Sequence, residues 1–192
     1  MKKTFEPTLP EGYREALLID AGELKFSILM NLAALALMIV ILVIVLPMLR
    51  LPSFTVFFSF SKLLLPVLLL FAYIVGHELV HGIAYKLLTG QTLTYGFKLT
   101  VAFCGVPDIY VYRRTALVSL LAPFTVFTLL FGGLTMFLHD PAWRVVFAFM
   151  LAIHIGGCVG DLYDTLLYLF RFRSPDTLMN DTGPAQTFYV KE

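Results

Sequence analysis

The sequence contains few charged residues and few cysteines, and each shortage excludes a class of protein. Charged residues make up 14% of the chain and hydrophobic residues 59%, a balance typical of polytopic membrane proteins rather than soluble domains. The formal net charge is +1, so no broad basic surface is available to bind nucleic acid. The two cysteines, Cys104 and Cys158, form neither a disulfide framework nor a C-x-x-C metal motif. We interpret both as small packing residues.

The N-terminal segment, residues 1–27, lacks the early apolar core of a cleavable signal peptide. It carries charged residues among a few apolar ones and is partly amphipathic, so we expect a cytoplasmic segment at the membrane surface, with a solvated arm as the alternative. The sequence also contains no internal repeat. Its 192 residues leave room for one membrane domain, which we assign to residues 28–170. The cytoplasmic tail, residues 171–192, is polar and contains a candidate strand at 187–190.

Four apolar segments within the membrane domain are each long enough to cross a bilayer. They cover residues 28–46, 63–88, 116–138 and about 142–170. We therefore predict an all-α membrane protein with about four transmembrane helices. Segments on one side of the bilayer would carry most of the Lys and Arg residues. Because cytoplasmic segments are rich in these residues, we expect a multi-pass plasma-membrane protein with both termini in the cytoplasm.

The segment between the second and third spans has a different pattern. Polar and apolar residues alternate from Thr92 to Phe103, with the period of two that is typical of a strand. Gly105, Pro107 and Asp108 are turn residues, and residues 109–112 can return as a second strand. We therefore predict a β-hairpin over residues 92–112 at the membrane surface.

The second span carries ionisable residues in its C-terminal third, within the run HELVHG. His77 and His81 lie four residues apart, so on a helix both imidazoles project from one face. This H-E-x-x-H spacing lets two imidazoles bind one zinc ion, while Glu78 acts as a general base on the metal-bound water. Ionisable groups are costly inside a bilayer and usually mark a functional site. A structural polar cluster is the alternative, because a lone histidine on an apolar helix is more often a packing residue.

A catalytic zinc needs three protein ligands and an open position for water. Asp161 is the first candidate for the third ligand, because its predicted depth in the fourth span matches that of the motif. His154 is the second candidate and Asp164 the third, since helical spacing would place both on the same face as Asp161. Three glycines would let the motif helix pack closely against this one: Gly156, Gly157 and Gly160.

The other histidines and aspartates are weaker candidates. His139 and Asp140 are predicted at the opposite membrane face, and Asp108 in the hairpin turn. The run Asp181-Thr182-Gly183 has the form of an aspartic-protease signature, but that chemistry needs two such aspartates facing each other. None of these residues therefore displaces Asp161 as the first choice.

The motifs together resemble the site-two protease superfamily of intramembrane metalloproteases. The runs HELVHG, LLAPF and GGCVGDLYD carry that similarity. Together with YGFKL and DTG, they resemble more closely a bacterial family of small membrane proteins called putative zincin peptidases, over residues 70–190. In the superfamily, an aspartate in a later helix is the third zinc ligand, and the resemblance implies this role for Asp161. It also implies that residues 92–112 can pair with an extended substrate, and that His154 lies near the position of the superfamily's asparagine.

We therefore expect a zinc endopeptidase that hydrolyses peptide bonds at or within the cytoplasmic side of the membrane. His77, His81 and Asp161 would hold Zn²⁺, Glu78 would take the proton of water, and His154 would help to stabilise the oxyanion. The substrate would be a membrane protein or peptide, held extended by strand addition to residues 92–112. The alternative is a non-catalytic metal-binding membrane protein, either a pseudoprotease or a metal carrier, which would need the ligands but not Glu78.

Overall fold

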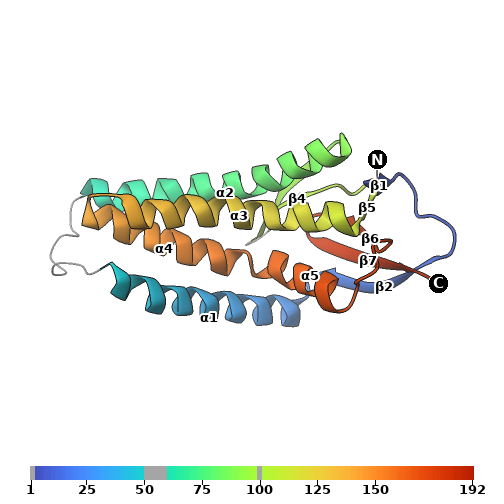
Figure 1. Ribbon diagram of the computed structural model, residues 1–192, viewed down its shortest axis with the longest axis horizontal. Helices are drawn as coiled ribbons and strands as arrows, with labels where there is room; N and C mark the ends of the chain where they lie inside the picture. The colour runs from blue at the N-terminus through green and yellow to red at the C-terminus, as the bar shows by residue number, and fades with distance from the viewer. Residues whose placement is uncertain (1–2, 50–59, 99–100) are drawn as a thin grey trace. The chain divides into compact units, whose positions relative to one another are not determined.

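The computed structural model describes residues 3–49, 60–98 and 101–192 (Figure 1). Its helices are α1 (Leu24–Met48), α2 (Phe60–Thr89), α3 (Arg113–Phe137), α4 (Pro141–Gly157) and α5 (Val159–Phe170). Its strands are β1 (Phe5–Glu6), β2 (Tyr13–Asp20), β3 (Thr94–Lys98), β4 (Val101–Gly105), β5 (Tyr110–Tyr112), β6 (Leu178–Asp181) and β7 (Ala185–Lys191). The chain is therefore mainly helical but not all-α.

Within the described residues, three helices are long and apolar enough to cross a membrane: α1, α2 from Leu64 onward, and α3. The pair α4 and α5 passes the same test together but is bent, so this part of the chain offers three candidate spans, or four if the pair is one span. Only 6% of the most apolar window of α1 is buried. Its Leu, Ile and Val side chains are therefore largely exposed, as expected for a helix surrounded by lipid.

The fourth predicted span, 142–170, is two helices rather than one. Asp140 caps the start of α4 by accepting a hydrogen bond from the backbone N–H of Ala142, and Pro141 occupies the first turn. At the C-terminal end of α4, the backbone N–H of Cys158 donates to the carbonyls of Gly156 and His154. Glycine has a low helix propensity, and the glycines on both sides of Cys158 favour a break at this point.

Two compact units make up the chain, each with its own core. Unit 1 comprises residues 1–29, 78–123 and 160–192, and its core contains Tyr85, Val111, Tyr168 and Phe188. Unit 2 comprises residues 30–77 and 124–159 and packs α-helical segments around Tyr73. Helices α1, α2 and α3 each contribute residues to both units.

Unit 1 contains a five-stranded sheet with the order β1-β5-β6-β7-β2, in which every neighbouring pair is antiparallel. The N-terminal segment thus supplies two strands, which the sequence analysis did not predict. In the tail, the candidate strand at 187–190 is confirmed within β7, whereas β6 was missed. Strand β2 pairs with β7 from Tyr13 opposite Lys191 to Asp20 opposite Ala185.

The predicted hairpin over 92–112 is wrong in its turn and in its second strand. The hairpin consists of β3 and β4, with Thr94 opposite Gly105, and its turn lies outside the described residues. Strand β5 instead pairs with β1 and β6 in the five-stranded sheet. The chain is redirected at Val106, whose N–H donates to the carbonyl of Asp181 at 2.8 Å. A Cβ at Gly105 would lie 2.5 Å from the backbone nitrogen of Gly183, so only glycine permits this approach.

Candidate metal centre

The H-E-x-x-H motif lies on α2, which continues without a break through both histidines. His77 and His81 are one turn apart, so their side chains project from the same side of the helix. Both are buried, whereas Leu79 and Ile83 on the opposite side are exposed. Glu78 is half-buried. The helix that the motif requires is therefore present, and it turns both imidazoles inward.

In unit 1, the imidazole of His81 is held by a backbone carbonyl. Its Nδ1 lies 2.9 Å from the carbonyl oxygen of Ser119 on α3. A carbonyl oxygen only accepts hydrogen bonds, so Nδ1 carries the proton, and Nε2 of the neutral ring presents a lone pair. This is the arrangement found in metal-binding histidines, in which the second nitrogen donates to a carbonyl or carboxylate.

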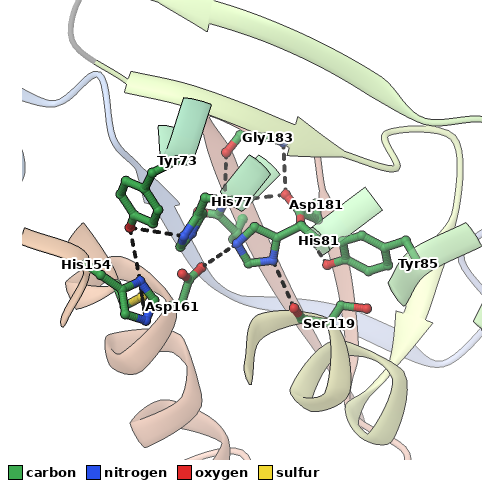
Figure 2. A network of polar contacts seen from close by, with 11 residues as sticks. Tyr73, His77, His81, Tyr85, Ser119, His154, Asp161, Asp181 and Gly183 are labelled. Carbon is green, nitrogen blue, oxygen red and sulfur yellow. Dashed lines mark hydrogen bonds and ion pairs between the residues drawn. The ribbon is translucent and has the colours of Figure 1, made fainter. Parts of the chain in front are cut away.

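Asp161 on α5 lies beside this lone pair: its Oδ1 is 3.4 Å from Nε2 of His81 (Figure 2). Two such acceptors repel each other unless a proton or a cation lies between them. In a tetrahedral zinc site with bonds of about 2.0–2.1 Å, neighbouring ligand atoms are roughly 3.3 Å apart. The pair therefore fits one edge of a zinc tetrahedron. The structure thus places Asp161, the first candidate for the third ligand, beside the motif histidine His81.

In unit 2, a tyrosine hydroxyl links His77 to His154. The Tyr73 oxygen lies 3.3 Å from Nδ1 of His77 and 3.1 Å from Nδ1 of His154 (Figure 2). On the far side of its ring, Nε2 of His154 lies 3.2 Å from the carbonyl oxygen of Phe124 and 3.2 Å from the hydroxyl of Thr128. Both nitrogens of His154 are therefore engaged within the interior of the unit.

The Phe124 carbonyl can only accept a hydrogen bond, and this fixes the direction of the other hydrogen bonds in the group. The Phe124 carbonyl requires a proton on Nε2 of His154, so Nδ1 of the neutral ring accepts from the Tyr73 hydroxyl. The Tyr73 oxygen then accepts from Nδ1–H of His77, and Nε2 of His77 presents a lone pair. His77 and His81 thus each present Nε2, as a result of separate contacts in separate units.

His154 occupies a different position from the one predicted. It belongs to α4 and Asp161 to α5, so the expectation that both project from one continuous helix is wrong. Its side chain is fully buried, and the ring centroids of one tyrosine and three phenylalanines lie within 6.1 Å of its own: Tyr73, Phe124, Phe127 and Phe131. A charged imidazolium would be costly in such surroundings. This environment favours a role in supporting His77 over contact with substrate.

Cys158 is a candidate that the sequence analysis set aside. One donor atom from each of His77, His154 and Cys158 lies within 4.8 Å of the others, so these three also form a possible metal group. The sulfur of Cys158 is 3.6 Å from Nδ1 of His154. The signal in the sequence is the four-residue spacing of His154 and Cys158. Since Tyr73 already bonds to both histidines, a thiol–imidazole contact is the simpler interpretation.

The glycines near Cys158 have three different environments. A Cβ at Gly156 would lie 2.7 Å from the backbone oxygen of Ala34, so α1 approaches α4 closely here. At Gly157 the nearest atom is the Tyr73 oxygen of the motif helix at 3.5 Å, an ordinary contact. At Gly160 nothing lies within 4 Å. The close helix approach that we predicted is therefore made by α1 at Gly156.

Asp181 is a buried carboxylate whose importance the sequence analysis missed. It accepts hydrogen bonds from the Tyr85 hydroxyl at 2.7 Å and the Gly183 N–H at 2.9 Å (Figure 2). Burial raises the pKa of Asp181 above its usual value, although these hydrogen bonds oppose the shift. Tyr85 lies one turn after His81 on α2. The Asp-Thr-Gly turn therefore anchors the end of the motif helix to the sheet.

The remaining candidates occupy positions that suit other roles. Asp164 is buried on α5, Asp108 and His139 are exposed, and Asp140 caps α4. Burial raises the pKa of the Cys104 thiol to about 12, so it is not a thiolate at neutral pH. Cys104 fits the packing role that we predicted.

A comparison with known protein families gives one match that includes the H-E-x-x-H motif and α5. A family model described as "Putative zincin peptidase" matches residues 69–175, more than half of the chain. The match includes His77, Glu78, His81 and Asp161, whereas Asp181 lies outside it. No curated protein and no solved structure matches the chain. The term zincin implies zinc, in agreement with the two imidazoles and the carboxylate described above. The chain belongs to the family of putative zincin peptidases.

Proposed function

We propose that this protein is a membrane-embedded zinc endopeptidase that cuts peptide bonds at or within the cytoplasmic side of the membrane. His77, His81 and Asp161 are the proposed ligands. The observation that carries the proposal is the His81–Asp161 pair, with ligand atoms 3.4 Å apart and the other imidazole nitrogen held by a carbonyl. Two imidazoles and one carboxylate leave a fourth position for water, as in other catalytic zinc sites.

Glu78 is the proposed general base. A zinc ion bound to the three ligands supplies Lewis acidity, which makes a water molecule acidic enough to react near neutral pH. Glu78 follows His77 directly on α2 and is half-buried, so it can reach a water molecule in the site without full exposure to solvent. Its carboxylate accepts the proton of the attacking water and returns it to the leaving amine.

The substrate that we propose is a membrane protein or peptide bound in an extended form. Among the described residues, β3 pairs only with β4, so its other edge is available for a further strand. A peptide added there would gain backbone hydrogen bonds, as in other cases of strand addition. The proposed binding strand is therefore β3, Thr94–Lys98, which is shorter than the 92–112 segment predicted from the sequence.

The principal competing function is a metal-binding protein without catalysis, which would use the same ligands but not Glu78. The experiment compares wild type, Glu78→Gln and the surface control Glu15→Gln in detergent, because Glu15 is exposed on β2. Zinc content is measured together with cleavage of a panel of transmembrane peptides. We expect all three proteins to hold one zinc per chain, and only Glu78→Gln to lose turnover, by about 10²-fold or more.

Three outcomes would contradict the proposal. Full activity of Glu78→Gln would exclude Glu78 as the base. Absence of zinc from wild type after loading with a zinc excess would exclude the metalloprotease itself. Cleavage by wild type that a zinc chelator does not inhibit would lead to the same conclusion.

A further inference from the structure

Helix α3 contains a proline in its interior, and this proline changes the hydrogen bonding of one particular carbonyl. Pro123 lies well inside the helix Arg113–Phe137 and is buried. In an α-helix the carbonyl of each residue accepts from the N–H four positions later. Proline has no N–H, so the residue four positions before it loses that donor. Here that residue is Ser119.

The carbonyl that Pro123 leaves without a helical donor is the one that binds His81. Nδ1–H of His81 donates to the Ser119 oxygen at 2.9 Å, and Ser119 is completely buried. A buried carbonyl without a donor is costly, so the imidazole fills a need that the proline creates. The Ser119 hydroxyl takes no part, because it has no hydrogen-bond partner in the described part of the chain.

We propose that Pro123 is a positioning residue for the metal centre: by withholding a backbone donor, it reserves the Ser119 carbonyl for His81 and so fixes Nε2 as the metal-binding nitrogen. The proposal rests on the proposed function only in treating His81 as a zinc ligand. An N–H at position 123 would compete with His81 for the same oxygen. His81 would then lose the contact that fixes both its ring orientation and its tautomer.

The test separates the missing N–H from the proline ring. In Pro123→Ala the N–H is restored. In a second variant, lactic acid replaces Pro123, which gives an ester that lacks both the ring and the N–H. Two controls complete the set: Ser119→Ala removes only the hydroxyl, and Pro47→Ala changes a proline in α1, a helix without any proposed site residue. All variants are full-length proteins in detergent.

Two readouts are used for each variant. Competition with a zinc chelator gives the zinc dissociation constant, which we expect Pro123→Ala to raise by about 10- to 100-fold. Nitrogen-15 spectra of the histidines, recorded on metal-free protein at alkaline pH, report the tautomer of His81. The His81 signal is identified by its absence from the spectrum of His81→Gln. We expect an Nδ1–H tautomer in wild type and a mixture in Pro123→Ala. The ester and both controls should match wild type in both readouts.

The outcomes separate this inference from the proposed function. Wild-type zinc affinity and a single His81 tautomer in Pro123→Ala would overturn the inference. If the ester variant showed the same loss as Pro123→Ala, the proline ring rather than the missing donor would be responsible, and the inference would again fail. If wild type bound no zinc, the proposed function would fail, but the tautomer comparison in metal-free protein would still decide the role of Pro123.

Discussion

The Tyr73 hydroxyl contacts Nδ1 of His77, and Tyr73→Phe tests how strongly the orientation of His77 depends on this contact. Phenylalanine keeps the ring, which packs edge-on against Phe127 and Phe131, and removes only the oxygen. Two imidazole nitrogens then lose a partner, those at 3.3 Å in His77 and 3.1 Å in His154. Each buried group left without a hydrogen bond costs about 1–3 kcal/mol.

The sum for two nitrogens is about 2–6 kcal/mol, but one of them has a substitute donor. The thiol of Cys158 lies 3.6 Å from Nδ1 of His154 and can donate weakly to it. We therefore expect Tyr73→Phe to lower the free energy of unfolding by about 2–3 kcal/mol. Zinc affinity should fall by about 10- to 100-fold, because His77 is no longer held in one tautomer.

The assay pairs a chelator competition with denaturation in detergent. Tyr163→Phe is the matched control, because it also removes one hydroxyl from a ring that packs edge-on against a phenylalanine, Phe26. The companion variant Cys158→Ser should keep one zinc per chain. Unchanged zinc affinity in Tyr73→Phe would refute the proposed link from His154 to His77. Loss of the zinc in Cys158→Ser would instead assign the metal to His77, His154 and Cys158.

Three further predictions concern other parts of the molecule. Asp161→Ala should lose the zinc whereas Asp164→Ala retains it, and the reverse result, measured by metal analysis, would move the third ligand to Asp164. Gly156→Ala should destabilise the protein by about 1–3 kcal/mol, because its Cβ would lie 2.7 Å from the Ala34 oxygen. Gly160→Ala should instead stabilise the protein by about 0.5–1 kcal/mol, because nothing lies within 4 Å of its added Cβ. Equal changes in the thermal unfolding of the two variants would contradict this packing. The pKa of Glu6 is lowered by hydrogen bonds from Lys3 and Tyr112, so its contribution to stability is present above pH 4.5 and disappears as the pH falls. Glu6→Gln should therefore be less stable than wild type at neutral pH and equal to it in acid, and a difference independent of pH would exclude this ion pair as the cause.

Local geometry explains which parts of the molecule could be predicted from the sequence. The spacing of His77 and His81 needs only the repeat of one helix, and the apolar lengths of α1, α2 and α3 need only the thickness of a bilayer. Asp161 was chosen because a carboxylate at that depth needs a partner, and His81 is a partner in the structure. In each case the relevant physics acts within one helix or on one side chain.

The features that the sequence analysis missed depend on partners far along the chain or on the exact position of a break. Alternation over residues 92–103 does not fix the position of a turn, so it could not show that β4 ends at Gly105 and that β5 joins another sheet. His154 was assigned to the face of Asp161 because one helix was assumed, whereas Cys158 separates two. The role of Pro123 depends on His81, which lies 38 residues away from Ser119.

The pairing of β2 with β7 has a consequence for how the protein is made. Tyr13 meets Lys191 in the sheet, so β2 is synthesised long before its partner exists. At about 5–20 residues per second, residues 13–20 leave the ribosome on the order of ten seconds or more before β7 does. During that interval, the open edge of β2 needs protection from other chains, and the sheet that anchors Tyr85 through Asp181 is incomplete. The anchor of Tyr85 at Asp181 is therefore complete only after the tail has been synthesised.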